Sequence, residues 1–233
     1  RSELRYLGQP LDARDLMFVC NSPELLTFEC FKSTSIPSCM GQNTNLRRLD
    51  LRGGRLNEPL PPELSALTKL VDFVAFEQSP RDAPLSERTS RCKLGWISKA
   101  MMFGPLTAIG TNESLWNETT LSHSYQTPWH CEADGWRPQF DDPSSPWWAW
   151  SKLERFWVDV NFVHGTIPEW LPHRWPRLRS LDLYSNELTG KVPASLGELT
   201  QLDTLQIQDN GLVGDFPFDA ILGLRKKTSS LNT

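Results

Sequence analysis

Residues 178–201, LRSLDLYSNELTGKVPASLGELTQ, decide the fold of this chain. Two neighbouring stretches align with them: LERFWVDVNFVHGTIPEWLPHRWPR begins at Leu153, and LDTLQIQDNGLVGDFPFDAILGL begins at Leu202. The shared frame is LxxLxLxxNxLxGxIPxxLxxLxx, about 24 residues long. Because Asn, Gly and a hydrophobic-Pro pair recur together with the leucines, chance spacing does not explain the pattern. The sequence therefore predicts an array of structural repeats.

Further copies of the frame extend the array towards the N-terminus. Leu46 begins LRRLDLRGGRLNEPLPPELSALTK, and Leu70 follows at the expected distance with LVDFVAFEQ. Stepping backwards, Leu25 begins a degraded copy, and Arg1 falls in register with it. We therefore predict about seven repeats.

The repeat that begins at Leu70 does not finish. After Gln78 the frame is lost, and it returns near Pro143. We interpret the excess between Leu70 and Leu153, about 59 residues, as one irregular insertion. The predicted organisation is residues 1–78 as N-terminal repeats, 79–142 as an island-like insertion and 143–233 as C-terminal repeats.

The frame has a direct physical meaning. Each LxL pair forms a short strand whose alternate residues point into the core. One strand cannot bury its apolar face alone, so stacked copies form a parallel sheet over a continuous core. The Asn at each strand end (Asn161, Asn186 and Asn210) binds backbone groups where the chain turns away. The Gly and Pro that follow suit a convex side of turns and short helices, which predicts an α/β solenoid with a parallel sheet on its concave face.

The segments Gly165-Thr166-Ile167-Pro168 and Gly190-Lys191-Val192-Pro193 carry a more specific resemblance. They resemble the plant-specific class of leucine-rich repeats, which is marked by LxGxIP. That class occurs in plant receptor ectodomains, in wall-associated inhibitors and in other secreted proteins, some of which have comparable island insertions. The resemblance implies an extracellular, receptor-like or secreted protein, and it is specific for fold rather than for function.

Five cysteines and two glycosylation sequons bear on the cellular compartment. Cys92 and Cys131 are the only cysteines of the insertion, so we expect them to pair. Cys20 and Cys39 occupy similar late positions in successive repeats, which stacking brings within disulfide reach. Cys30 replaces a strand leucine and is expected to be a buried thiol. Two disulfides imply an oxidising compartment, whereas five free thiols in a cytosolic repeat protein are the alternative.

The sequons begin at Asn112 and Asn117, inside the insertion. If the chain is secreted, they predict N-linked glycans on an exposed loop.

Ligand binding is expected on the outward strand positions of the concave sheet. The middle of the array is rich in Arg and aromatic residues there, which are enriched at interface hot spots, although aromatics on strands also serve cross-strand packing. The return limb of the insertion, Trp147 to Trp150, feeds directly into the strand of Trp157, so the insertion is expected to wall one side of this surface. The candidate ligand-binding residues are Arg48, Arg52, Phe76, Arg155, Trp157, Asp159 and Tyr184.

Other function classes find little support in the sequence. The four histidines have no metalloprotease spacing, and we find no GxSxG motif, glycine-rich phosphate loop or CxxC pair. We therefore expect no enzyme activity, cofactor or metal. A net charge of −4 gives no electrostatic case for nucleic acid, and no apolar run is long enough to span a membrane.

Two functions stay open. The first is a non-catalytic extracellular binding module that recognises a protein, peptide or glycan on its concave face. The second is a structural component of a large extracellular or surface assembly. Neither end of the sequence carries a capping motif, so we expect the chain to belong to a longer protein or a larger assembly.

Overall fold

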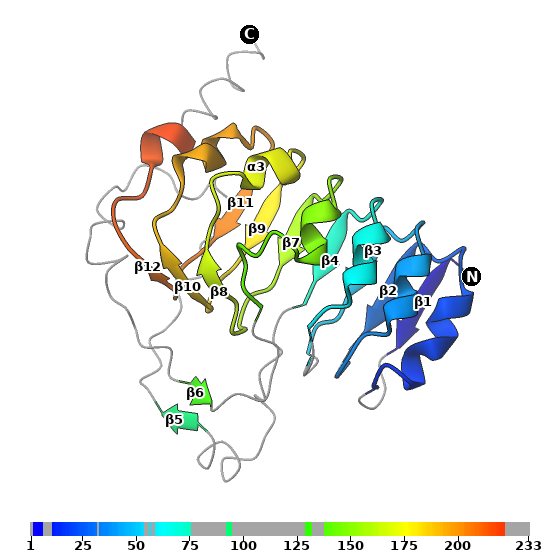
Figure 1. Ribbon diagram of the computed structural model, residues 1–233. Helices are drawn as coiled ribbons and strands as arrows, with labels where there is room; N and C mark the ends of the chain where they lie inside the picture. The colour runs from blue at the N-terminus through cyan, green and yellow to red at the C-terminus, as the bar shows by residue number, and fades with distance from the viewer. Residues whose placement is uncertain are drawn as a thin grey trace.

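The computed structural model describes residues 2–6, 11–31, 33–53, 56, 59–75, 92–94, 129–131 and 138–221. Figure 1 shows these residues as a stack of similar coils, with a long sheet on one side and short helices on the other. The predicted Phe76, Asn112 and Asn117 lie outside the described residues. In the described part of the chain, no helix is long and apolar enough to cross a membrane.

A parallel sheet of seven strands forms one side of the molecule, one strand for each predicted repeat. Its central row of core residues stays in register from end to end: Leu4, Phe28, Leu49, Phe73, Phe156, Leu181 and Leu205. The predicted solenoid fold and its repeat number are therefore confirmed. In order across the sheet, the strands are β1 (Glu3–Tyr6), β2 (Thr27–Cys30), β3 (Arg48–Asp50), β4 (Asp72–Val74), β7 (Arg155–Trp157), β9 (Ser180–Asp182) and β11 (Thr204–Gln206).

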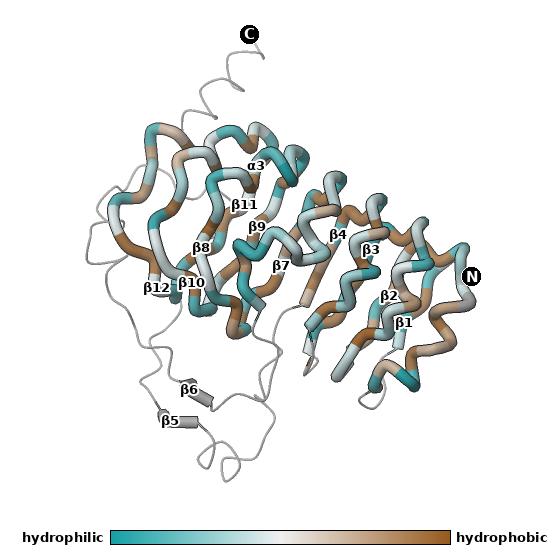
Figure 2. The backbone as a smooth tube through the Cα atoms, viewed as in Figure 1, coloured by the Kyte–Doolittle hydropathy of each residue, from teal (hydrophilic) through white to brown (hydrophobic). Residues whose placement is uncertain are grey.

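Short helices line the opposite side and close the core (Figure 1). Prolines occupy the first turn of three of them, where their fixed φ suits a helix start. Figure 2 shows that hydrophobic and hydrophilic segments recur along each coil of the stack. The helices are η1 (Asp15–Asn21), η2 (Ser38–Gln42), η3 (Pro62–Ala66), η6 (Pro146–Ala149), α3 (Leu171–Arg174) and η7 (Ala194–Glu198).

A second parallel sheet follows the LxG part of the frame, where the sequence was expected to form turns and short helices. Its strands are β8 (His164–Thr166), β10 (Glu187–Gly190) and β12 (Gly211–Leu212). The glycines Gly165 and Gly190 have positive φ values of 93° and 78°, which only glycine adopts freely. β10 therefore ends at its glycine, whereas β8 continues for one residue beyond Gly165 before the chain turns towards the helix.

Asparagine side chains bond backbone groups of the turn between the two sheets, as the sequence predicts, and they also link neighbouring repeats into a ladder. Asn186 donates from Nδ2 to the carbonyls of Val158, 2.9 Å away in the preceding repeat, and of Leu183, 3.0 Å away in its own. Its Oδ1 accepts the backbone N–H of Val163 at 3.0 Å. Asn210 repeats the same three contacts one repeat later. Each turn is thereby bonded to its neighbour.

The chain leaves the large sheet after Ala75 and rejoins the described fold at Pro138. Both ends are held by the turn after β7: Asn161 Nδ2 donates to the Ala75 carbonyl at 2.7 Å, and the His164 N–H donates to the Pro138 carbonyl at 3.1 Å. Phe140 is completely buried, so the solenoid core resumes within the segment predicted as residues 79–142. Because β4 pairs directly with β7, the long excursion does not interrupt the sheet.

The return limb, Trp147 to Trp150, packs into the core. Trp147 and Trp150 are 2% and 0% exposed, and the Trp150 indole donates to the Leu64 carbonyl in η3 at 2.8 Å. Trp148 stacks on Trp175 with ring centroids 4.4 Å apart. These large rings therefore fill the space between the sheet and the helices, and the wall expected of the insertion lies mainly outside the described residues.

The cysteines occupy three kinds of position. Cys20 in η1 and Cys39 in η2 form a disulfide with Cα atoms 5.3 Å apart, as their stacking suggested. Cys30 is a free, buried thiol whose pKa burial raises to about 11. The backbone places Cys92 directly opposite Cys131 in a two-stranded antiparallel pair, β5 (Cys92–Leu94) and β6 (Trp129–Cys131). A disulfide between these two stays a prediction.

Candidate functional site

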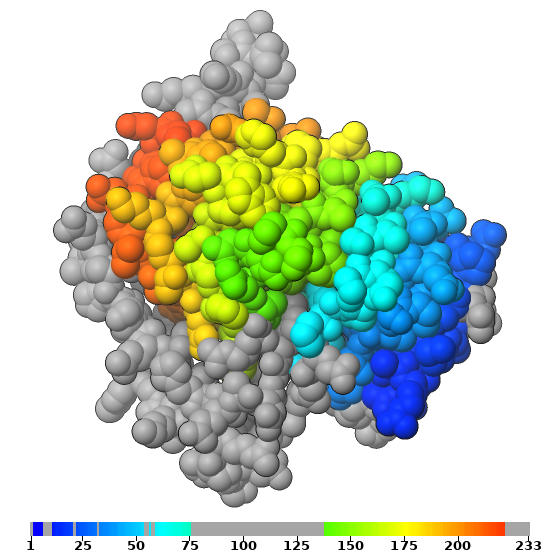
Figure 3. Space-filling view, viewed as in Figure 1, coloured from blue at the N-terminus to red at the C-terminus, as the bar shows by residue number. Residues whose placement is uncertain are grey.

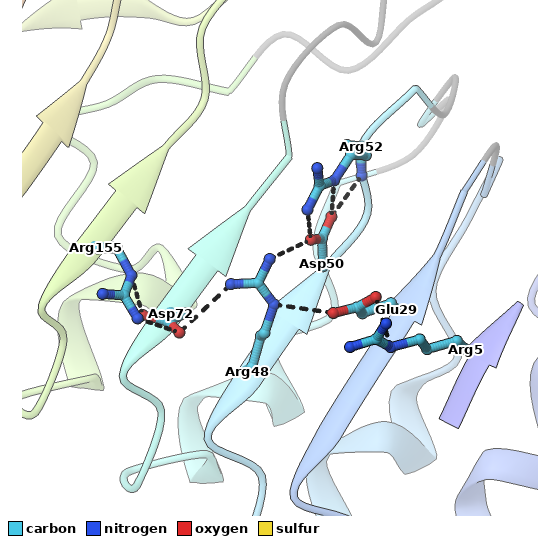
Figure 4. Close-up of polar contacts among 7 residues, drawn as sticks. All are labelled: Arg5, Glu29, Arg48, Asp50, Arg52, Asp72 and Arg155. Atoms are coloured by element: carbon cyan, nitrogen blue, oxygen red, sulfur yellow. Dashed lines mark hydrogen bonds and ion pairs between the residues drawn. The ribbon is translucent and has the colours of Figure 1, made fainter. Parts of the chain in front are cut away.

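The concave face is the surface of the seven-stranded sheet that points away from the core. Its side chains come from the strand positions that alternate with the buried row, as the two-residue period requires. Arg48, Asp50, Asp72 and Arg155 therefore lie side by side on β3, β4 and β7 (Figure 4). The sequence predicted this face from the same alternation, but it did not predict the contacts between repeats.

One network of charged residues covers β1 to β7. Arg48 is at its centre, with Nε 3.2 Å from Glu29 Oε1, one terminal nitrogen 2.7 Å from Asp50 Oδ2 and the other 3.5 Å from Asp72 Oδ2. Arg155 contacts the Asp72 carboxylate with two nitrogens, each 2.7 Å from an oxygen. Figure 4 shows these contacts running across the neighbouring strands.

Two more arginines complete the network. Arg52 binds the Asp50 carboxylate through Nε at 2.9 Å and through a terminal nitrogen, and this contact raises the pKa of its guanidinium. Its guanidinium carbon also lies 5.2 Å from the centre of the Phe31 ring. Arg5 on β1 pairs with Glu29 at 3.1 Å. Three of the predicted site residues, Arg48, Arg52 and Arg155, thus belong to one connected cluster.

Positive and negative groups differ sharply in exposure within this cluster. The side chains of Glu29, Asp50 and Asp72 are 11%, 0% and 10% exposed. The four arginine side chains are 25% to 62% exposed (Arg5, Arg48, Arg52 and Arg155). Four arginines and three carboxylates leave one net positive charge, 4 − 3 = +1. The carboxylates lie underneath, so solvent meets mainly guanidinium groups.

Trp157 adjoins the arginine cluster on β7. Its side chain is half-buried, and the indole Nε1 donates to Ser180 Oγ on β9 at 2.8 Å. In the sheet register it lies between Val74 on β4 and Asp182 on β9. Trp157 is therefore a large, fixed apolar surface at the boundary between two parts of the concave face.

The part of the concave face beyond Trp157 has a different character. Tyr184 donates its backbone N–H to Asp182 Oδ1 at 3.1 Å, and its side chain is hydrogen-bonded to Asp209. Burial raises the pKa of Asp182 to about 6, despite that hydrogen bond, and it also raises the pKa of Asp209. Among the described residues, neither carboxyl group forms an ion pair with a Lys, Arg or His side chain. The cluster around Tyr184 is thus acidic and only partly compensated.

The remaining candidates lie apart from the arginine cluster. Asp159 is half-buried in the turn after β7, where its carbonyl accepts from Asn161 Nδ2 at 3.2 Å. The site prediction omitted the buried carboxylates Glu29, Asp50 and Asp72. Their signal was present in the sequence, because acidic and basic residues alternate at the outward positions of successive strands.

A second concavity, a hollow of about 440 Å³, lies between the segments that lead into η3 and η6. Its lining residues belong to no strand of the large sheet, and the sequence did not predict it. They are Pro59, Leu60, Pro62, Pro138, Gln139, Asp142, Ser144, Ser145, Pro146 and Trp147. Among the described residues, no group of three or more His, Cys, Asp or Glu side chains is arranged to hold a metal ion.

Known leucine-rich-repeat proteins match parts of the repeat array. A profile of the Leucine Rich Repeat family matches residues 45–67 and 177–199. Receptor-like protein 18 of Arabidopsis thaliana is 48% identical over 66 residues, and Receptor-like protein 34 of the same plant is 37% identical over 68 residues. These stretches cover 28% and 29% of this chain but only 8% and 7% of the two relatives. The plant receptor-like class of repeat, recognised from LxGxIP, is confirmed.

Two solved structures share the fold over most of the chain. A TDR receptor aligns with a TM-score of 0.50 at 21% identity, over 84% of this chain and 24% of that one. The plant peptide hormone receptor RGFR1, in complex with RGF2, aligns with a TM-score of 0.51 at 18% identity, over 91% of this chain and 29% of that one. At these identities the likeness establishes the leucine-rich-repeat fold.

Proposed function

The chain is a leucine-rich-repeat protein of the plant receptor-like type, and on that premise we propose that it is an extracellular recognition module that binds a protein or peptide on its concave face. The proposed contact surface consists of Arg48, Arg52, Arg155 and Trp157. Tyr184 lies beyond Trp157 and contacts the far end of the same ligand. Phe76 and Asp159, which the sequence also indicated, are proposed as flanking contacts.

The observation that carries this proposal is the exposure of guanidinium groups above buried carboxylates. The arginines are held in place by Glu29, Asp50 and Asp72, so little side-chain entropy is lost when a ligand binds. The guanidinium-bearing side chains of Arg48, Arg52 and Arg155 are 25%, 31% and 41% exposed, and guanidinium groups favour carboxylates with bidentate geometry. Trp157 adds a fixed apolar surface beside them, and Arg–Trp combinations are common at binding hot spots. The best-fitting ligand is an acidic segment that carries an adjacent apolar side chain.

Two further observations support an extracellular setting. The Cys20–Cys39 disulfide fits an oxidising compartment. The curated relatives that match the repeats are receptor-like proteins, although they match over a small part of their length. We propose that the protein follows the secretory pathway, that Cys92 and Cys131 form a second disulfide, and that Asn112 and Asn117 carry N-linked glycans.

The binding proposal is tested with a random peptide-display library panned on the folded chain. We expect selected peptides to be enriched in Asp and Glu beside one apolar residue. Truncation of a central aromatic anchor costs about 2–4 kcal/mol of binding free energy. Trp157→Ala and Arg155→Gln should therefore each weaken a selected peptide at least about tenfold in a calorimetric titration.

Arg179→Gln is the matched control. Arg179 has a similar exposure, 48% against 41% for Arg155, and it also contacts acidic side chains, but it lies outside the concave network. Its replacement should change the dissociation constant less than about twofold, as expected for a residue outside the contact surface. Selection of basic peptides, or equal losses in the Arg155 and Arg179 variants, would contradict the proposed site.

A structural role in a larger assembly is the second candidate. It is favoured by one observation, the partly exposed apolar side chains Leu4 and Tyr6 at the β1 edge of the sheet. Native mass spectrometry of the protein from its source separates the two roles. A free protein that binds the selected peptides supports recognition, whereas a chain present only in a large complex supports a structural role.

A further inference from the structure

Asn210 differs from the other two ladder asparagines in the residue that follows it. Phe follows Asn161 and Glu follows Asn186, whereas Gly211 follows Asn210, and this is the one Asn-Gly pair in the sequence. Figure 3 shows the repeat that begins at Leu202, in orange to red, beside the preceding repeat, in yellow to orange. Glycine has no side chain to hinder its backbone nitrogen, so this nitrogen can reach the amide carbon of the preceding residue. Asparagine is a chemically labile residue, and here its covalent setting favours deamidation.

Deamidation at this pair needs water and no other reactant. The Gly211 backbone nitrogen gives up its proton and attacks Asn210 Cγ, so that a C–N bond forms and the Cγ–Nδ2 bond breaks. The side-chain nitrogen takes up a proton and leaves as ammonia. One water molecule then opens the cyclic imide at either of its carbonyl groups, which gives aspartate or isoaspartate. The overall change is from amide and water to acid and ammonia, with no oxidation or reduction.

The ladder holds the Asn210 amide in a different arrangement. Its Nδ2 donates to the carbonyls of Leu183 at 2.9 Å, Ile207 at 3.0 Å and Gln208 at 3.2 Å. Its Oδ1 accepts the backbone N–H of Leu188 at 2.9 Å. Two of these carbonyls precede the asparagine in its own turn, so the amide faces back along the chain, and its nitrogen, the leaving group, is held by three acceptors. Deamidation therefore requires that this turn opens first.

Packing between the strands of the second sheet favours glycine at position 211. A Cβ atom there would lie 3.2 Å from the carbonyl oxygen of Leu188 and 3.4 Å from Thr189 Cγ2 on β10. Both contacts come from the pairing of β12 with β10. The labile pair is thus part of the sheet itself, and another residue after Asn210 would have to push its neighbours apart.

The acid product cannot restore the ladder. An ionised carboxylate accepts hydrogen bonds but has no N–H group to donate, so it cannot bond the carbonyls of Leu183, Ile207 and Gln208. Isoaspartate in addition inserts one more carbon atom into the backbone of the turn. The same turn accepts the Asn186 N–H at the carbonyl of Asp209, 3.1 Å away. Loss of donors in a closely bonded turn costs free energy, so a converted turn closes less readily than the parent.

We propose that Asn210 is a deamidation site which the asparagine ladder keeps closed, and that its conversion uncouples the repeat beginning at Leu202 from the repeat before it. The reaction does not reverse, so each molecule keeps a chemical mark of the opening of this turn. The proposal is independent of what the concave face binds.

Peptide mapping of the urea-unfolded chain tests the reactivity of the pair. At mildly alkaline pH, Asn210 should convert to aspartate and isoaspartate well before Asn161 or Asn186. Gly211→Glu should slow Asn210 to the rate of Asn186, and Glu187→Gly should make Asn186 as fast as Asn210. Packing does not affect these comparisons because the chain is unfolded. Equal rates at the three asparagines of the parent, or a rate at Asn210 that Gly211→Glu leaves unchanged, would overturn the assignment.

The folded chain tests the control by the ladder. At the same pH and temperature, Asn210 should convert at least about tenfold more slowly than in urea, because the reaction is limited to the fraction of molecules whose turn is open. A rate in the folded chain equal to the rate in urea would show that the ladder gives no protection.

The last experiment measures the consequence of conversion. Asn210→Asp should lower the melting temperature by at least about 2 °C, because three donated hydrogen bonds are lost. It should also speed hydrogen exchange at the Val213 N–H, which donates to the Gly190 carbonyl at 2.8 Å between β12 and β10. Gln201→Glu makes the same amide-to-acid change at an exposed position of the preceding repeat, and both measurements should stay at the parent values. Parent-like melting and exchange in Asn210→Asp would overturn the proposed uncoupling.

Discussion

The two parts of the concave face are built on the same repeat, but they differ in whether their carboxylates are paired with arginines. From β1 to β7, Glu29, Asp50 and Asp72 are covered by arginines that reach across neighbouring strands. From β9 onwards, Asp182 and Asp209 have Tyr184 between them and no ion-pair partner among the described residues. The buried row beneath runs through both parts without a change of register.

The scaffold of a repeat protein sets the positions of the outward side chains. The identity of these side chains sets the charge of the face. The scaffold fixes where each side chain stands, about 4.8 Å from its neighbour on the next strand. At that spacing an arginine on one strand can neutralise a carboxylate on another, whereas a carboxylate beside Ser, Tyr or Gln cannot be neutralised. One part of the face is therefore a charged network, and the other contains carboxyl groups that resist ionisation.

The largest expected change in the free energy of unfolding comes from removing the carboxylate that contacts two arginines. Asp50 is completely buried and contacts both Arg48 and Arg52. Asp50→Asn removes the buried counter-charge that both guanidinium groups contact, and loss of one partner of a buried pair costs about 3 kcal/mol or more. Urea unfolding of the variant should show a loss of that order in the free energy of unfolding.

Asp203→Asn is the control for the Asp50 variant. Asp203 also faces an arginine, Arg179 at 3.7 Å, but its side chain is 69% exposed. Exposed pairs contribute little, so this change should alter the unfolding free energy by less than about 0.5 kcal/mol. Equal effects at Asp50 and Asp203 would mean that the buried network has no special role in stability.

In the second part of the face, from β9 onwards, replacing a carboxylate is expected to raise the free energy of unfolding by a smaller amount. The pKa of Asp182 is raised from its model-compound value of 3.8 to about 6, so the folded state binds this proton more tightly than the unfolded state does. Stability from this group is therefore present at low pH and is lost as the pH rises through about 6. Asp182→Asn removes the charge but keeps an oxygen for the Tyr184 N–H.

The variant should be more stable than the parent by about 1–2 kcal/mol at pH 7.5, after allowance for partial exposure of the carboxyl group. The difference between the two should vanish near pH 4, which urea titrations across this range will measure. The variant and the parent are compared at each pH because other carboxylates also titrate. A constant difference at all pH values would show that Asp182 is not the group responsible.

The sequence predicted the features that depend on contacts along one repeat. The spacing of Leu181 and Leu183 predicted the strand, and the position of Asn186 predicted a side chain that bonds backbone groups of the turn, because each is determined within about 24 residues. It also identified Arg48, Arg155 and Trp157 as outward residues. These predictions share one basis, the alternation of side chains along a strand.

The remaining features depend on packing between repeats. The second sheet was missed because a segment such as Glu187–Gly190 suits a turn or a strand equally well until neighbouring copies pair with it. The burial of Asp50 beneath two arginines could not be predicted. Such a prediction needs to know how far each side chain on adjacent strands extends from the sheet.

The smallest expected change in stability comes from a substitution at the boundary between the two parts of the face, just before Asn161. Val160 has a φ of 55°, and the equivalent residues of the next two repeats, Ser185 and Asp209, have a φ of 54°. A β-branched residue is strained in this left-handed region, whereas Asn, Asp and Ser tolerate it better. Val160→Asn should therefore stabilise the fold by about 0.5–1 kcal/mol, reduced in part by the loss of a half-buried apolar side chain.

Ser185→Asn is the comparison for this change, because it introduces the same residue at the same turn where no β-branched side chain is replaced. Thermal unfolding should show a rise in melting temperature for Val160→Asn and a smaller rise for Ser185→Asn. If Val160→Asn is destabilising, the apolar contacts of Val160 outweigh its backbone strain. Val160 would then stabilise the turn after β7 despite its left-handed backbone. The same turn binds both ends of the excursion between Ala75 and Pro138, through Asn161 and His164.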